Sequence, residues 1–268
     1  MVRIAVAGIG GRMGSRIARL VEETEGVRLT GGFEHPDHPA AGKEGAAVLG
    51  TPVADPFVVG GSIREVLPEA DVVIDFTSAA ASVAHLEAAA EAGKAMVVGS
   101  TGFQPGQTER AGELARRIPC VLAPNMSVGV NVLFQMVGDL ARLLGERFDV
   151  EIVETHHRYK KDAPSGTALK LARVAAEALG RDLGDTGVYA RHGLVGERSS
   201  KEIGVQTLRG GDIVGEHTVL FAGLGERIEV THRAHSRDTF ARGAIRAATW
   251  VVRQKPGLYD MHHVLGIA

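Results

Sequence analysis

The feature that most constrains this chain is a glycine-rich turn near its beginning, placed between an apolar strand and a helix. Residues 2–7 are apolar and rich in β-branched side chains, a pattern typical of a buried parallel strand. Gly8, Gly11 and Gly14 follow in a G-x-x-G-x-x-G spacing, and apolar residues then recur at helical spacing over residues 17–21. Glycines allow the backbone to approach a pyrophosphate, which binds at the start of the helix. This order of strand, turn and helix predicts a dinucleotide-binding domain.

A second predicted strand, residues 27–33, ends at Glu34, which bears on the choice of cofactor. A carboxylate about 20 positions after the glycine turn accepts hydrogen bonds from a ribose 2′-hydroxyl. The same charge repels the 2′-phosphate of NADPH, and Arg12 and a protonated His35 would offset part of that repulsion. The sequence therefore predicts that both NADH and NADPH are used, with some preference for NADH.

Strands and helices continue to alternate up to about residue 126. We expect a loop-rich segment at 35–61, strands at 70–76, 95–99 and 118–125, and helices at 79–92 and 105–117. Asp75-Phe76-Thr77 and Gly99-Ser100-Thr101 come where strands end. Ligands bind at the carboxyl ends of parallel strands, although each tripeptide alone is equally compatible with an ordinary turn.

The pattern changes near residue 127. We expect helices at 131–144, 165–179 and 239–252, and strands at 148–155, 201–208, 212–221 and 227–232, with hairpin-like turns at 210–212 and 223–225. The predicted fold is α/β: a Rossmann-like dinucleotide-binding domain over residues 1–126, followed by an α+β domain with a mixed or antiparallel sheet over residues 127–236. Residues 237–268 are expected to return to the first domain.

Composition narrows the classes of function. The chain has 268 residues, with 30 Lys and Arg against 32 Asp and Glu, a formal charge of −2 that argues against a nucleic-acid or membrane-surface role. Any positive field for an acidic ligand must therefore be local. A single cysteine, Cys120, excludes an internal disulfide framework. No uninterrupted apolar run reaches membrane-spanning length, so a cytoplasmic protein is expected.

The segment from His156 to Thr167 (HHRYKKDAPSGT) concentrates reactive groups. Histidine exchanges protons near neutral pH, and lysine offers positive charge to an anion. Ser165 precedes an apolar-periodic run, and the free N–H groups of such a helix start bind anions. The segment indicates an active site for an acidic small molecule. Without the glycine turn, a solvated basic loop would be an equally good interpretation.

Together these segments resemble the 4-hydroxy-tetrahydrodipicolinate reductase family, formerly dihydrodipicolinate reductase, of lysine and diaminopimelate biosynthesis. The similarity rests on the glycine turn, on Asp75-Phe76-Thr77, and on the segments 99–103, 125–131 and 156–167, and it extends through 211–217 and 225–227. It implies an NAD(P)H-dependent oxidoreductase that reduces a cyclic dicarboxylate to tetrahydrodipicolinate. It also implies a homotetramer, assembled through the sheet of the second domain.

The resemblance implies a role for individual residues. His156 matches the proton donor and Lys160 its partner, while His157, Gly166 and Thr167 match positions that hold a substrate carboxylate. The positions that match cofactor contacts are Gly8, Ile9, Gly10, Gly11, Arg12, Met13, Glu34, His35, Gly99, Ser100, Thr101, Ala123, Pro124, Asn125 and Met126. Two of these depart from relatives: His35 stands where several have Arg, and Met126 where some have Phe.

Three other classes compete with this interpretation. A related amino-acid dehydrogenase would lack the His-His-Arg-x-Lys loop joined to Ser-Gly-Thr, and a redox-sensing nucleotide-binding protein would need no proton donor. A metal enzyme would draw on the histidines at 156, 157, 232, 235, 262 and 263. Adjacent imidazoles diverge on extended backbone, and no H-E-x-x-H spacing occurs, so no metal is expected.

Overall fold

The computed structural model describes residues 1–267, and the chain divides into two compact units. Unit 1 comprises Met1–Val128 and the chain from Asp238 onward, whereas unit 2 comprises Gly129–Arg237. The boundaries expected from the sequence, 126/127 and 236/237, lie two residues and one residue from these. The chain therefore leaves unit 1, forms unit 2 and returns.

Unit 1 is built on a six-stranded parallel sheet in the order β11-β5-β4-β3-β1-β2. Its strands are β1 (Val2–Ala7), β2 (Val27–Phe33), β3 (Val72–Asp75), β4 (Ala95–Val98), β5 (Pro119–Leu122) and β11 (Gly257–Tyr259). Strand order reverses between β1 and β3, and ligands of such sheets bind where the order reverses. β11 is an edge strand that the sequence did not reveal, because three residues carry no periodicity.

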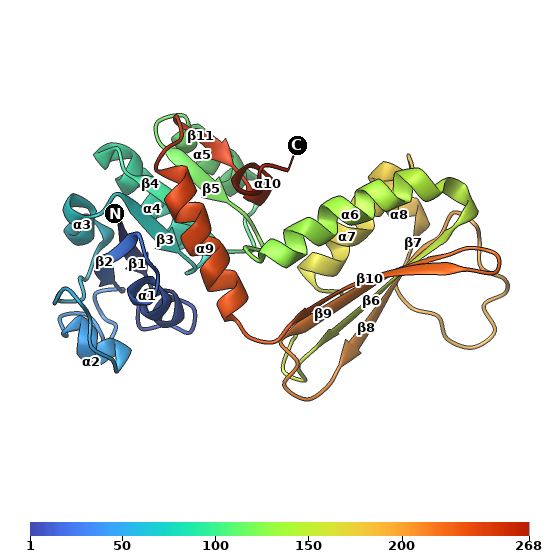
Figure 1. Ribbon diagram of the computed structural model, residues 1–268, viewed down its shortest axis with the longest axis horizontal. Coiled ribbons are helices and arrows are strands. Elements are labelled where there is room, and N and C mark those ends of the chain that lie inside the picture. Colours follow the sequence, from blue (N-terminus) through green and yellow to red (C-terminus); the bar gives the residue numbers. More distant parts are fainter. Residues whose placement is uncertain (268) are drawn as a thin grey trace. The chain divides into compact units, whose positions relative to one another are not determined.

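Helices cover both faces of this sheet (Figure 1). The helices are α1 (Gly14–Glu22), α2 (Gly45–Leu49), α3 (Ile63–Val66), α4 (Ala79–Ala92), α5 (Pro105–Ala115), α9 (Asp238–Val251) and α10 (Met261–Leu265), with a 3-10 turn at Leu67–Glu69. α1 and α9 bury their apolar sides against one face, where Ile4 and Val6 of β1 point. α4 and α5 cover the other face, where Ala5 and Ala7 point. Alternating residues of one strand thus enter two different cores.

Unit 2 contains a five-stranded mixed sheet in the order β10-β9-β6-β8-β7. Its elements are α6 (Val128–Leu144), a 3-10 turn (Gly145–Arg147), β6 (Asp149–His156), α7 (Gly166–Ala178), α8 (Leu183–Thr186), β7 (Gly187–Val188), β8 (Ile203–Arg209), β9 (Gly215–Ala222) and β10 (Arg227–Ala234). α6 and α7 pack on the same face of the sheet, around a core that includes Phe134, Ile152 and Phe221 (Figure 1).

The two predicted hairpins of unit 2 have different outcomes. Residues 223–225 do form the turn of an antiparallel hairpin between β9 and β10, closed by a bond from Gly223 N–H to the carbonyl of Glu226. The turn at 210–212 is not a hairpin. β8 pairs in parallel with β6, and β9 pairs antiparallel with the other edge of β6, so β6 separates them. Two strands that are neighbours in the sequence were expected to be neighbours in the sheet. The strand that separates them, β6, precedes its partners by 53 residues at Val150–Ile203 and by 61 residues at Thr155–Glu216, so no local signal indicated it.

One helix, residues 128–147, is long and apolar enough by length and composition to cross a membrane. Its buried side chains Val130, Leu133, Phe134 and Val137 lie in the core of unit 2. This is how the core helix of a globular unit packs.

The glycine turn depends on one close approach between backbone atoms. Gly8 has φ of +64°, and a Cβ at Gly14 would lie 2.0 Å from the Gly8 carbonyl oxygen. Only glycine allows α1 to start so close to the end of β1.

Gly14→Ala is therefore expected to lower the free energy of unfolding by about 1–3 kcal/mol and to weaken NADH binding, because the turn must open. Gly112→Ala is the matched control, since Gly112 lies in α5 and an added Cβ would meet nothing within 4 Å. The control should be neutral or more stable by up to about 1 kcal/mol. Denaturant unfolding and NADH fluorescence measure both effects, and equal results for the two variants would contradict this account.

Candidate functional site

In unit 2, one face of the sheet changes from apolar to polar along β6. Val150 and Ile152 are buried in the core, and Glu154 and His156 continue the same face. In register, Glu154 pairs with Thr207 of β8 on one side and with His217 of β9 on the other. The helix-covered core therefore ends in a cluster of ionisable groups at the carboxyl end of β6.

The carboxylate of Glu154 is the centre of this cluster and has no solvent exposure. Its Oε2 lies 2.5 Å from His156 Nδ1 and accepts a bond of 2.8 Å from Arg209. Its Oε1 accepts bonds from the Ser165 amide (3.0 Å), from Arg209 (3.0 Å) and from the Thr207 hydroxyl (3.3 Å). Donors from two strands, β6 and β8, and from the start of α7 therefore converge on one anion.

These bonds keep Glu154 ionised. Burial alone would raise the pKa of Glu154, but hydrogen bonds from His156 and Arg209 hold that pKa at about 2. An ionised carboxylate only accepts hydrogen bonds, so His156 Nδ1 must carry the proton of the bond they share. The Nε2 atom of His156 is then the atom available for chemistry. It lies over Gly215 of β9, where a Cβ would come within 2.9 Å of it.

His217 lies beside this pair as a neutral group. Its ring meets the His156 ring edge-on, with centroids 5.2 Å apart, and its Nε2 lies 3.1 Å from the Ser165 hydroxyl. Burial, followed by the neighbouring His156 charge, lowers the pKa of His217 to about 3. His217 Nδ1 is buried and has no hydrogen-bond partner among residues 1–267.

The start of α7 lies next to the same cluster. Ser165 caps the helix by accepting a bond from the Ala168 amide, and its own amide is held by Glu154. Gly166 is exposed, and Thr167 is partly exposed. This 13-residue helix thus begins at an exposed residue, and the start of a helix is suitable for binding an anion.

The loop between β6 and α7 supplies the cations. Lys160 binds both carboxylate oxygens of Asp162, at 2.9 and 2.8 Å, and this bond lowers the pKa of Asp162. Asp162 had not been expected as a partner. His157 Nδ1 is buried without a partner in the part of the chain that the structure describes. The structure thus brings His156, His157 and Lys160 together with the helix start in one unit.

In unit 1, the glycine turn presents backbone donors at the carboxyl end of β1. The Gly10 amide donates to Glu34 Oε1 at 2.8 Å, and the Gly11 amide donates to the Gly8 carbonyl. Within residues 1–267, the amides of Arg12 and Met13, just before α1, make no hydrogen bond. Two unpaired N–H groups at a helix start fit the pyrophosphate of a dinucleotide.

A cavity of about 450 Å³ adjoins this turn and is lined by Gly8, Glu34, Thr77 and His85, among others. Asp75, fully buried at the end of β3, binds His85 Nδ1 at 2.7 Å and accepts two bonds from Thr77. Burial would raise the pKa of Asp75, but these bonds lower it. His85 and Thr77 were not among the predicted site residues, although Thr77 stood in a motif.

The other predicted cofactor residues also lie at carboxyl ends of strands. Gly99, Ser100 and Thr101 follow β4, and the hydroxyl of the buried Ser100 bonds to Ser82 at 2.8 Å. Ala123, Pro124, Asn125 and Met126 follow β5, and Met126 is only 1% exposed. Ile9 is fully buried in the core, so its side chain packs under the turn. His35 is exposed, and its Nδ1 lies 3.5 Å from the Asp37 carboxylate.

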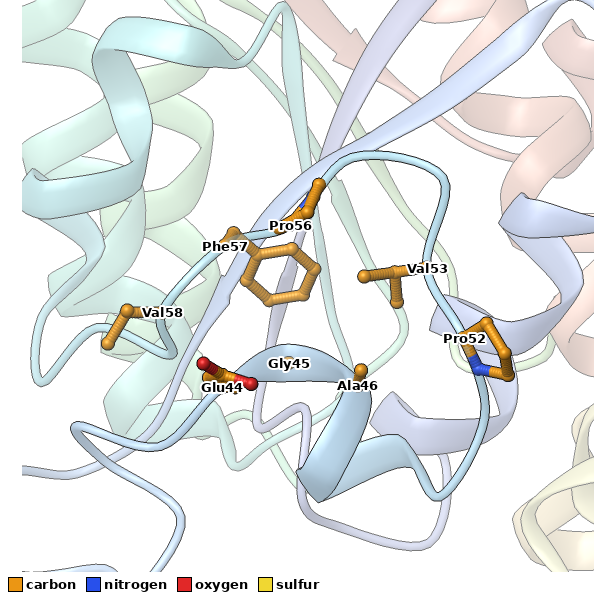
Figure 2. A pocket seen from close by; sticks show the side chains of 8 residues that line it. All are labelled: Glu44, Gly45, Ala46, Pro52, Val53, Pro56, Phe57 and Val58. Atoms are coloured by element: carbon orange, nitrogen blue, oxygen red, sulfur yellow. The ribbon is translucent and has the colours of Figure 1, made fainter.

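A cavity larger than the one beside the glycine turn lies elsewhere in unit 1 (Figure 2). It measures about 580 Å³ and is lined by Pro52, Val53, Phe57 and their neighbours beside α2. Glu44 is its one ionisable lining residue. It contains none of the predicted site residues, so volume is a poor guide to the site here.

The six histidines considered as metal ligands in the sequence are divided between the two units. His262 and His263 belong to α10 in unit 1, where His263 bonds to Asp260, and those at 156, 157, 232 and 235 lie in unit 2. Across residues 1–267 no three His, Cys, Asp or Glu side chains are arranged to hold a metal ion.

Sequence reasoning missed Glu154, Arg209 and His217. One signal was available. In the predicted strand, Glu154 lies on the same face as the apolar residues Val150 and Ile152, so a buried carboxylate was implied. Nothing in the sequence indicated its partners, because Arg209 is 55 positions away.

The chain is similar to known proteins over its full length. Family models described as "Dihydrodipicolinate reductase, N-terminus" and "Dihydrodipicolinate reductase, C-terminus" match residues 2–126 and 129–265. The 4-hydroxy-tetrahydrodipicolinate reductase of Syntrophobacter fumaroxidans is 67% identical over 268 residues, covering 100% of both chains. That of Syntrophus aciditrophicus is 58% identical over 266 residues, covering 99% of both.

A solved structure shows the same likeness. Dipicolinate-bound dihydrodipicolinate reductase from Paenisporosarcina sp. TG-14 superimposes with a TM-score of 0.76 at 25% identity, covering 100% of both chains. The resemblance seen in the sequence is thereby confirmed, as is the two-part α/β fold class. The chain belongs to the dihydrodipicolinate reductase family, the NAD(P)H-dependent oxidoreductases now named 4-hydroxy-tetrahydrodipicolinate reductases.

Proposed function

We propose that unit 1 binds NADH or NADPH and that unit 2 binds the cyclic dicarboxylate and protonates it through His156. The observation that carries this proposal is the pair of His156 and Glu154, which lies beside the start of α7. A proton donor and an anion site thus lie within one cluster. The dipicolinate bound by the Paenisporosarcina relative has two carboxylates, which supports a ligand of this class.

The cations of unit 2 and the helix start at α7 suit the carboxylates of the substrate. The first turn of α7, with Gly166 and Thr167, would receive one carboxylate through backbone N–H groups. His157, whose Nδ1 is unpaired in residues 1–267, would add a bond to it. Lys160 would replace one of its hydrogen bonds to Asp162 by a bond to the substrate. This would place fixed positive charge beside the negative charge that develops on the substrate.

The proton has a defined origin in this scheme. Loss of water from the 4-hydroxy substrate leaves a conjugated imine. A nicotinamide held by unit 1 would supply the hydride that ring carbon four of this imine accepts. The neighbouring ring carbon must then be protonated, and His156 Nε2 is the donor, because Nδ1 is committed to Glu154. The neutral His217 next to it neither competes for the proton nor adds charge at working pH.

A coupled assay tests the reductase reaction and the cofactor preference together. Pyruvate and aspartate semialdehyde are condensed by the preceding synthase, and oxidation of NADH and NADPH is followed separately. We expect consumption that requires both proteins, and a higher kcat/KM with NADH. The preference for NADH is expected because Glu34, which accepts a hydrogen bond from the Gly10 amide, puts negative charge at the turn. In addition, the Asp37 carboxylate beside His35 reduces the positive charge available to a 2′-phosphate. No oxidation of either cofactor would overturn the function, and a strong NADPH preference would overturn the role of Glu34.

Glu34→Gln should reduce the expected preference for NADH by raising kcat/KM for NADPH, because a neutral amide no longer repels the 2′-phosphate. Glu25→Gln is the matched control, since Glu25 is exposed and lies outside the turn. The same assay measures both variants. An unchanged ratio of the two cofactors in Glu34→Gln would remove Glu34 from cofactor selection.

His156→Gln is expected to lower kcat by about 10²- to 10⁴-fold, the usual contribution of a general acid, with little change in NADH affinity. His192→Gln, in an exposed loop of the same unit, should behave as wild type. Steady-state kinetics and NADH titration separate the two quantities. If His156→Gln retains wild-type turnover, His156 is not the proton donor.

We also propose that the chain forms a homotetramer through the sheet of unit 2. α6 and α7 cover one face of that sheet, and the other face presents half-buried side chains such as Val153, Thr218 and Leu220 without a covering helix (Figure 1). A second copy of this face is the partner that would cover it. Light scattering should give four times the chain mass of 28.2 kDa, and a monomer mass would refute the assembly.

A further inference from the structure

We propose that Glu154 is a positioning residue, which fixes both the proton-bearing atom of His156 and the substrate-binding start of α7. The inference rests on the proposed role of His156 and adds a residue that acts through it. Glu154 does not reach solvent, so it does not touch substrate.

The first argument is that one carboxylate holds two functional parts. Its Oε2 bonds to His156 Nδ1, and its Oε1 bonds to the amide of Ser165, the residue that caps α7. The separation between the proton donor and the anion site is therefore set by a single rigid group. Precise spacing of this kind decides how closely a bound substrate carbon approaches the donor.

The second argument concerns the imidazole itself. A carboxylate bonded to Nδ1 holds one ring orientation and one tautomer, and it stabilises the protonated ring. Gly215 leaves the Nε2 edge of the ring uncrowded, because any Cβ there would come within 2.9 Å. Glu154 and Gly215 thus act on opposite edges of the same ring.

The charges around this pair come from every element that packs against it. Arg209 of β8 binds both oxygens of Glu154. His217 of β9 is neutral, His232 of β10 lies beside it in register, and the loop contributes Lys160 paired with Asp162. Glu154 is therefore the negative charge in direct contact with His156, and Arg209 is the positive charge that opposes it.

A matched pair of substitutions tests the proposal. Glu154→Gln should lower kcat by about 10- to 100-fold, since removal of an orienting carboxylate costs this much or more. It should raise KM for the dicarboxylate, because an amide N–H₂ faces one of the donors Ser165, Thr207 or Arg209. Glu151→Gln is the control: it removes a carboxylate from the same strand, on the opposite face, that also binds two arginines, Arg191 and Arg198. Control kinetics should match wild type.

The pH profile separates positioning from general damage. The donor must be protonated, so kcat falls at high pH. Loss of the adjacent negative charge should move that fall to lower pH in Glu154→Gln. Arg209→Gln removes the opposing positive charge and should move the fall to higher pH. Shifts in the same direction, or none in either variant, would overturn the proposal.

A readout without turnover keeps this test independent of the proposed reaction. Nitrogen-15 spectra of histidine-labelled protein, assigned with His156→Gln, should show His156 protonated at Nδ1 in wild type and in Glu151→Gln, but not held in that form in Glu154→Gln.

If Glu154→Gln does not fold, as judged by NADH binding and circular dichroism, Glu154→Asp replaces it. Aspartate keeps the charge but is one methylene shorter, so the fall in kcat should stay at the wild-type pH while kcat drops. A wild-type tautomer and a wild-type kcat in these variants would show that Glu154 is not a positioning residue.

Discussion

The carboxylate of Glu154 is the interaction on which the architecture of unit 2 depends. An isolated charge without solvent costs several kcal/mol, and it is tolerated only when it is paired and its lone pairs are satisfied. Here the donors come from β6, β8 and the start of α7, so a shift of any one of these elements takes a hydrogen bond from the buried anion. The apolar core of the unit holds the sheet and helices together, and this polar end fixes their register.

Unit 1 reaches its function by a different physical route. Its site is made of backbone: the positive φ of Gly8, the contact that excludes a side chain at Gly14, and the unpaired amides of Arg12 and Met13. Backbone donors carry no net charge, so a carboxylate, that of Glu34, can lie beside them. Unit 2 instead presents a full charge, that of Lys160, in the loop before α7. This division would allow a chain with a formal charge of −2 to bind the two anionic ligands of the proposed function.

Local patterns predicted most of the fold, and non-local pairing limited the rest. The helix expected at 79–92 has the bounds of α4, because Ser78 caps it and Gly93 ends it. The turn at 210–212 was wrong as a hairpin, since β6 lies between the strands it joins. The His156–Thr167 segment was evident because its residue types are rare in combination. Glu154 was missed because a glutamate in a strand usually faces water. Its alternation with Val150 and Ile152 implied burial, but no local pattern indicated its partners Arg209 and Ser165.

The same cluster sets the pH range in which unit 2 is stable and reactive. The pKa of Glu154 is lowered from 4.5 to about 2, so its stabilising contribution is complete above 4.5 and is lost as pH falls toward 2. The pKa of His217 is lowered from 6.5 to about 3, so folding is opposed as pH falls below 6.5, because the unfolded chain takes up this proton more readily. Near neutral pH, Glu154 therefore stays charged and His217 stays neutral. These two neighbours of His156 keep a constant charge in that range, so the proposed proton transfer would take place in a cluster whose own protonation does not change.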